Sequence, residues 1–174
     1  MNGISVSPVV LLINGIPECL LVAWAMYIFT GTPLHAKKYL ILSGVYAVAT
    51  YLIRFLPITL GINTVLFLFV LIFSFQILHQ SSLSKLVRSI ISSVVILILI
   101  AVSEVCNVLL LTAFYGREAA ETLFTSPNGL TRAVYSSPSN LFLGLFVLGS
   151  YFLMKLIQKK KDEKNGKVSE ETSK

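Results

Sequence analysis

Long runs without any charged residue are the feature that most limits how this chain can fold. Ile62–Leu78 and Ile90–Val102 contain no lysine, arginine, aspartate or glutamate. Charged residues make up only 13% of the 174 positions and hydrophobic residues 55%, whereas roughly a quarter of an average globular domain is charged. The chain is too apolar for a soluble domain, and it predicts an all-α, polytopic integral membrane protein.

Five of the apolar runs reach or approach the length of about 20 residues that a bilayer-spanning helix needs. Segments rich in proline, glycine and polar residues, such as "TGTPLHAKK" and "LPITLGIN", separate them. The predicted spans are residues 8–30, 39–56, 62–78, 90–114 and 140–157. Residues 1–158 are therefore expected to form one transmembrane bundle. Residues 159–174, which hold six lysines and four acids, are expected to be a disordered basic cytoplasmic tail.

The distribution of positive charge predicts the orientation of this bundle. With five spans, the two termini lie on opposite sides of the membrane. If the C-terminus is cytoplasmic, eleven of the fourteen lysine and arginine residues lie on that side, and only Arg54, Arg117 and Arg132 lie on the other. Cytoplasmic loops carry an excess of lysine and arginine. The chain is therefore expected to be N-out and C-in, as a multi-pass protein of a bacterial cytoplasmic membrane.

Three ionisable residues fall inside the predicted spans: Glu18, Arg54 and Glu104. Each costs about 3 kcal/mol at the centre of a bilayer, so each needs a partner or a wet cavity. With a rise of about 1.5 Å per residue, Arg54 and Glu104 both lie about 21–23 Å from the inner edge. We therefore expect an ion pair between them, with Asn107 one turn from Glu104 on the same helix face. The alternative is that Arg54 extends to the outer headgroups.

Glu18 lies near the predicted midplane, directly after Pro17 and one turn from Asn14. A proline in a membrane helix leaves backbone carbonyls without partners and tends to kink the helix. A kinked helix would let Asn14 and Glu18 line a polar cavity open to the outside. Alternatively, apolar surroundings keep Glu18 protonated and bonded to a neighbouring helix. The candidate ligand-binding residues are Asn14, Glu18, Arg54, Glu104 and Asn107.

Two polar segments lie at the predicted membrane surfaces. The outer segment, residues 115–139, contains "GREAAETLF", which predicts a short helix lying in the interface, either as a surface cap or as a ligand lid. On the inner side, the last span is followed by Lys159, Lys160 and Lys161. These lysines are expected to attract anionic lipid headgroups at about 1 kcal/mol per charge. The alternative is that they only set the topology.

The residue types needed for catalysis or metal binding do not come together in the predicted topology. His35 and His79 fall in inner loops, and no HExxH, GxSxG or paired-aspartate motif occurs. Cys106 lies about 20 Å from His79 in depth, too far for a thiolate–imidazole pair. The sequence therefore predicts no catalytic residue, no metal site and no cofactor. The net charge of +6 reflects the inner loops and does not indicate a nucleic-acid partner.

Several segments follow one another in an order that is found in one class of receptors. A short outer hairpin, "YLIRFLPITLGINT", precedes a basic inner loop, "SLSKLVRSIISS", an acid in the next span at "SEVCN", and a long loop before the last helix. Over about residues 1–160, this order resembles the membrane-embedded sensor region of Gram-positive histidine kinases of the GHKL, agr-type peptide-sensing class. That family continues into a phosphoacceptor histidine and an ATP-binding domain, whereas no histidine follows His79 here. The resemblance implies a two-component receptor unit without the kinase part.

The leading functional hypothesis is a non-enzymatic membrane sensor or regulatory subunit. It would receive an external small molecule or peptide, or the state of the lipid bilayer, and pass the signal through the last two spans to a cytoplasmic or membrane signalling protein. The first alternative is a substrate-binding membrane subunit of a small-molecule importer, with Asn14, Glu18, Arg54 and Glu104 lining the site. The second is a membrane scaffold protein. A homodimer is compatible with each hypothesis.

Overall fold

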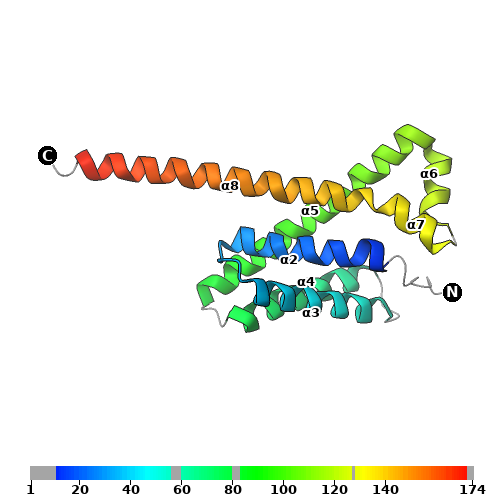
Figure 1. The fold of residues 1–174 in the computed structure, drawn as a ribbon, viewed down its shortest axis with the longest axis horizontal. Coiled ribbons are helices and arrows are strands. Elements are labelled where there is room, and N and C mark those ends of the chain that lie inside the picture. Colours follow the sequence, from blue (N-terminus) through cyan, green and yellow to red (C-terminus); the bar gives the residue numbers. More distant parts are fainter. Residues whose placement is uncertain (1–10, 56–59, 80–82, 127, 172–174) are drawn as a thin grey trace.

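The computed structural model describes residues 11–55, 60–79, 83–126 and 128–171, and within them every regular element is helical (Figure 1). The elements in chain order are the π-helix η1 (Leu11–Gly15) and the α-helices α2 (Ile16–Thr30), α3 (Ala36–Phe55), α4 (Leu60–His79), α5 (Leu83–Tyr115), α6 (Arg117–Phe124), α7 (Gly129–Ser136) and α8 (Pro138–Glu171). The all-helical class predicted from the sequence is confirmed for this part of the chain.

The helix α2 lies in the middle of the bundle. Figure 1 shows α3 and α4 on one side of it and α8 on the other, with α5 crossing obliquely from one side to the other, while α6 and α7 lie together at one end. α2 packs against α3, α5 and α8, and α4 packs against α3 and α5. We call α6 and α7 the cap. The opposite end, where α2 finishes and α3 begins, is called the basic end.

The central position of α2 agrees with its composition. Apart from Glu18 in its first turn, its side chains are apolar or neutral on all sides, a pattern typical of a helix surrounded by other elements or by lipid. Val22, Ala23, Ala25 and Met26 are completely buried. They form the centre of a core that includes apolar side chains of α3, α4, α5 and α8. The small alanines let the neighbouring helices approach α2 closely.

A row of buried serines lies along α5. Ser89, Ser93 and Ser103 are almost completely buried, and each donates a hydrogen bond to the carbonyl four residues earlier in its own helix, over 2.6–3.0 Å. Their hydroxyls are thereby satisfied without a partner on another helix. The Ser93 hydroxyl also lies 3.7 Å from the sulfur of Met26 in α2. Small side chains of this kind bring two helices close together.

The first predicted span, residues 8–30, consists of two elements in its described part. The π-helix η1 ends at Gly15, and α2 begins at Ile16 with Pro17 in its first turn. A proline donates no backbone hydrogen bond, and its ring clashes with the carbonyl of the preceding turn. The change from π to α geometry therefore occurs at the proline that the sequence analysis singles out.

α2 ends at a glycine in a left-handed conformation. Gly31 has φ 63° and ψ 25°, and the backbone N–H groups of Gly31 and Thr32 donate to the carbonyls of Ile28 and Tyr27. The Arg88 guanidinium of α5 donates to the carbonyl of Thr30 over 3.2 Å. The last turn of α2 is thus held by its own backbone and by a cation of α5, as helix C-termini favour.

Helix α6 occupies residues for which the sequence predicts a short helix, but α7 is not anticipated. In addition, α8 does not end with its apolar stretch: it continues to Glu171, whereas disorder is expected from residue 159. The lysines and glutamates of this segment are good helix formers, so the helix extends beyond the apolar residues. Similarly, α5 begins at Leu83 instead of Ile90.

By length and composition, three segments in the described part of the chain are long and apolar enough to cross a membrane: Leu12–Thr30, Ser84–Tyr115 and Gly129–Ile157. The apolar described part of α4, Val65–His79, is shorter, and α3 is not among the three. The count of five spans therefore stays a prediction.

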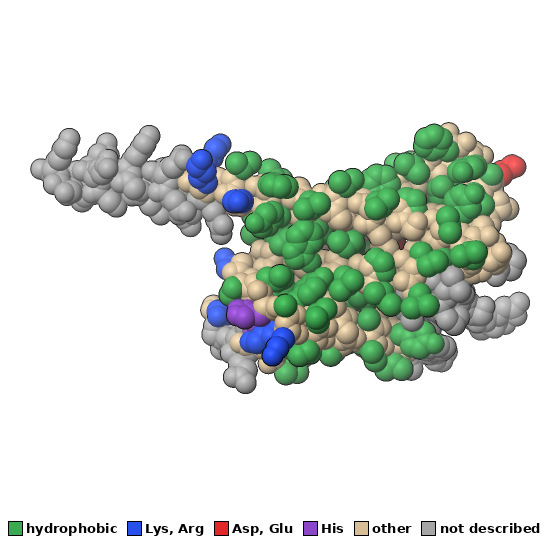
Figure 2. All heavy atoms as spheres, in the orientation of Figure 1, with side chains coloured by type: hydrophobic (Ala, Val, Ile, Leu, Met, Phe, Trp, Pro, Cys, Tyr) green, Lys and Arg blue, Asp and Glu red, His purple; other side chains and the backbone are tan. Residues whose placement is uncertain are grey.

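Large apolar side chains cover the outside of the bundle (Figure 2). Phe114, Ile77 and Leu141 are 72–78% exposed. Figure 2 also shows lysine, arginine and histidine side chains gathered at the basic end. A soluble protein rarely exposes such a continuous apolar surface, whereas a helical bundle in lipid does, because lipid tails are as apolar as the side chains.

Replacing Ala23 by leucine tests the enclosure of α2. Since Ala23 has no exposed surface, the larger side chain overpacks the core, and we expect the free energy of unfolding to fall by about 1–3 kcal/mol. Ala113→Leu is the control, because it makes the same alanine-to-leucine change at an exposed position of α5. It is expected to change the free energy of unfolding by less than about 0.5 kcal/mol. Denaturation in detergent, followed by circular dichroism, measures both. Equal losses would contradict the central position of α2.

Candidate functional site

Two asparagines join the cap to the bundle, and a third joins α8 to η1. The Asn14 side-chain amide of η1 donates to the Ala133 carbonyl of α7 over 3.1 Å. The Asn107 amide of α5 donates to the Tyr135 carbonyl over 3.1 Å. Both carbonyls belong to the last turn of α7, and that of Ala133 also accepts from the backbone N–H of Ser137. α7 is therefore held by side chains from two different elements.

The third asparagine, Asn140, connects the start of α8 to η1. The Asn140 amide donates to the backbone carbonyl of Asn14 over 3.0 Å. On the other side of the cap, the rings of Tyr115 and Tyr135 meet edge to face at 5.7 Å between centroids, and the Asn128 side chain accepts a hydrogen bond from Leu130 N–H at the start of α7. Hydrogen bonds thus join α7 to η1 and α5, and α8 to η1.

The structure brings together two of the five predicted site residues, Asn14 and Asn107, under the cap. The Oδ1 atoms of both are buried and accept no hydrogen bond from any residue that the structure describes. Buried acceptors without a donor are uncommon and costly, so this is a place where a donor from another molecule would be stabilised. Asn140 was not singled out in the sequence because it lies at the boundary of a span, where polar residues are ordinary.

Glu18 and Glu104 are each about one turn from one of the predicted asparagines, Asn14 and Asn107 respectively. Glu18 is half-buried in the first turn of α2, where the partial positive charge of the helix N-terminus favours an acid. Glu104 is exposed on α5, although it is one turn from the buried Asn107. It lines a cavity of about 420 Å³ together with Tyr46 and Ser93 and with apolar side chains of α4 and α5.

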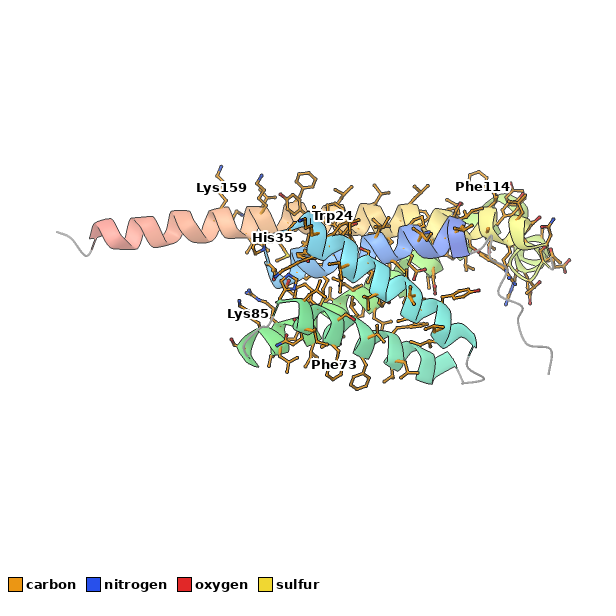
Figure 3. The ribbon with its side chains drawn as sticks, turned by 60° about the horizontal axis from the view of Figure 1, so that its bottom comes forward. Trp24, His35, Phe73, Lys85, Phe114 and Lys159 are labelled. Atoms are coloured by element: carbon orange, nitrogen blue, oxygen red, sulfur yellow. The ribbon has the colours of Figure 1, made fainter. Side chains whose placement is uncertain are left out.

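The predicted ion pair between Arg54 and Glu104 stays a prediction. Arg54 belongs to the last turn of α3, but its side chain lies outside the described residues, as does the side chain of Lys161 in the tail. Lys159 and Lys160 are exposed on α8 beyond the bundle (Figure 3). Their contacts with lipid headgroups also remain a prediction.

A cluster of aromatic rings lies at the basic end, and no pattern in the sequence indicates it. The Tyr27 ring of α2 meets those of Phe75 and His79 edge to face, at 5.5 and 5.3 Å between centroids, and the latter two rings stack at 4.4 Å. His79 Nδ1 donates to the carbonyl of Phe75 over 3.1 Å. The Tyr27 hydroxyl and His79 Nε2 are buried without a hydrogen-bond partner among the described residues.

Among the described residues, no group of three or more histidine, cysteine, aspartate or glutamate side chains is placed to hold a metal ion. Cys19 is buried in α2, Cys106 is half-buried in α5, and they do not form a disulfide. The chemistry of the cap site is that of neutral amides and carbonyls, which suits binding by hydrogen bonds.

Comparison with known proteins returned no matching family model, no matching curated protein and no matching solved structure.

Asn107→Ala tests the attachment of the cap. Removing the amide leaves the Tyr135 carbonyl without this donor and is expected to cost about 0.5–1.5 kcal/mol locally. Amide hydrogens of α7 should then exchange about 2- to 12-fold faster, which mass spectrometry of peptides from this helix measures. Thr122→Ala is the control, because the Thr122 hydroxyl bonds only within α6. Unchanged exchange in Asn107→Ala would show that its hydrogen bond does not hold α7.

Proposed function

We propose that the protein is a non-enzymatic membrane sensor or regulatory subunit. In this proposal the cap receives an external ligand, or a change in the membrane, and α8 transmits the signal to a cytoplasmic or membrane signalling partner. The observation that carries the proposal is the course of α8. It begins under the cap at Pro138 and continues without interruption to Glu171, beyond the end of the bundle (Figure 1).

The proposal places the bundle in a bacterial cytoplasmic membrane, with the N-terminus and the cap outside and the basic end inside. The exposed apolar side chains and the three long apolar segments support this placement. The charge distribution supports the orientation, since Lys37, Lys38, Lys85 and Lys155 all lie toward the basic end. In this arrangement α6 lies in the outer interface, with its apolar side toward the lipid.

Signal transmission is proposed to use the hydrogen bonds of the three asparagines. A ligand that binds one position of α7 more tightly than another shifts the population toward that position. Asn107 of α5 donates to α7 directly, so a displaced α7 changes the restraint on α5. Asn14 of η1 also donates to α7, and Asn140 of α8 donates to Asn14, so the same displacement reaches α8 through η1. α5 and α8 also pack against each other, so a movement of one helix is expected to carry the other with it.

The order of segments that resembles the sensor regions of agr-type kinases agrees with this proposal. The importer alternative requires its predicted binding residues to share one cavity. The described side chains favour the sensor over this alternative, because Asn14 lies under the cap while Glu104 lines a cavity together with side chains of α4.

The orientation is tested by labelling introduced cysteines in intact cells. In a background of Cys19→Ala and Cys106→Ala, Thr122→Cys reports on the cap and Lys160→Cys on α8 beyond the bundle. A membrane-impermeant maleimide should label Thr122→Cys at once and Lys160→Cys only after the cells are permeabilised. The opposite order would overturn the N-out, C-in orientation.

Coupling between the cap and the tail is tested by distance measurement with spin labels. Labels on Lys37→Cys and Lys159→Cys, in the same background, report the position of α8 relative to α3 at the basic end. Weakening the cap with Asn107→Ala, which removes a hydrogen bond to α7, should shift this distance by about 1–2 Å or broaden its distribution, as small helix shifts do.

Thr122→Ala serves again as the control and should leave the distance distribution unchanged. If Asn107→Ala also leaves it unchanged, then α8 does not respond to the cap. The scaffold alternative, in which the polar residues only hold the bundle together, would then be preferred.

A further inference from the structure

Two adjoining hollows form a groove between α2 and α8. The first has a volume of about 650 Å³ and is lined by Pro17 and Leu21 of α2 and by Gly144 and Leu148 of α8, among others. The second, of about 620 Å³, continues one turn further along both helices. Together they extend from the start of α8 near the cap to the basic end.

The walls of this groove are apolar and are not covered by the rest of the chain. Leu141 and Leu145 are 72% and 63% exposed, and Trp24 and Tyr151 line the second hollow. Gly144 contributes to the depth of the groove, because a Cβ atom at this position would meet only the end of the Leu21 side chain, 3.7 Å away. Each hollow has the volume of a typical small-molecule site.

Cations surround the groove at the basic end. Lys155 lines the second hollow, together with Gly31 and Thr32 at the end of α2. These two residues also line a small cavity of about 130 Å³ that contains Lys85 and Arg88. In Figure 3, the labelled Trp24 and Lys85 lie toward this same end. Among the residues that the structure describes, no acidic side chain lines any of the three cavities.

We propose that this groove binds one anionic phospholipid, with an acyl chain between α2 and α8 and the phosphate at the basic end. The groove is lined on α8 from Asn140 to Lys155, a distance of about 22 Å along the helix. One leaflet contributes about half of the roughly 30 Å hydrocarbon core of a bilayer, so the groove is long enough for an acyl chain of one leaflet. Lys155 and Arg88 flank the last turn of α2, where they pair with a headgroup phosphate.

A second copy of the chain fits the groove less well than a lipid. Two copies in one membrane share the same orientation, so a two-fold symmetric contact through this groove places both Lys155 side chains at the same depth near the symmetry axis. Like charges at such a contact repel each other. An anionic lipid instead brings the complementary charge.

Native mass spectrometry of the full-length protein in detergent tests the proposal, with phosphatidylglycerol and phosphatidylcholine of identical acyl chains as probes. The wild type should retain phosphatidylglycerol preferentially. Lys155→Gln should lower this preference about fivefold, which corresponds to one cation near an anionic lipid. Gly144→Leu fills the groove and should reduce retention of both lipids.

Each variant has a matched control on the same helix. Lys159→Gln removes a lysine beyond the groove, and Gly149→Leu adds a leucine where a Cβ meets no atom within 4 Å. Both should bind lipid like the wild type. Since Lys155 is exposed, its variant should fold normally even if Gly144→Leu does not.

Three outcomes would overturn the proposal. The first is an equal loss of lipid in Lys155→Gln and Lys159→Gln, which would indicate general attraction to positive charge. The second is displacement of phosphatidylglycerol by millimolar inorganic phosphate, which would indicate a site for soluble anions. The third is a dimer that Gly144→Leu dissociates. The lipid-site proposal shares with the sensor hypothesis only the placement in a bilayer. Absence of coupling between the cap and the tail would therefore not contradict the lipid site.

Discussion

The enclosure of α2 is the constraint on which the rest of the structure depends. A helix that is apolar on every side cannot lie at the edge of a bundle in water, and in lipid it gains stability from close packing with its neighbours. The fully buried Ala23 and Ala25 keep the surrounding helices near the α2 backbone, and Ser93 keeps α5 close to Met26. Three long helices, α3, α5 and α8, pack against α2. A displacement of any one of them therefore changes the packing of α2 against the other two.

The two ends of the bundle satisfy their backbone groups in different ways. At the basic end, the left-handed Gly31 turns the chain, and Arg88 donates to the last carbonyl of α2, that of Thr30. At the cap, carbonyls of α7 are instead bound by neutral amides from Asn14 and Asn107. Amide hydrogen bonds are weaker than those of a charged group. The cap is therefore the end that is more easily rearranged, as expected of a region that responds to a ligand.

The sequence predicted the helical class, and it singled out two of the three asparagines, because an amide inside an apolar run is conspicuous. It did not reveal Asn140, which stands where a polar residue is ordinary, or α7, whose "SPNG" and "SSPS" surroundings indicate turns. α7 is stabilised by side chains that are distant in sequence, and local propensity carries no information about such contacts. The aromatic cluster around Tyr27 was missed for the same reason: its members come from α2 and α4.

The length of α8 has a mechanical consequence. Its 34 residues give a rod of about 51 Å, considerably longer than the roughly 30 Å hydrocarbon core of a bilayer. A rod of this length acts as a lever: a tilt of about 5° about its start under the cap would carry its far end by about 4 Å. The stiffness of α8 would then transmit the movement along the helix without a chain of separate side-chain contacts. A change too small to alter the packing around α2 would still be large at the end that a cytoplasmic protein could contact.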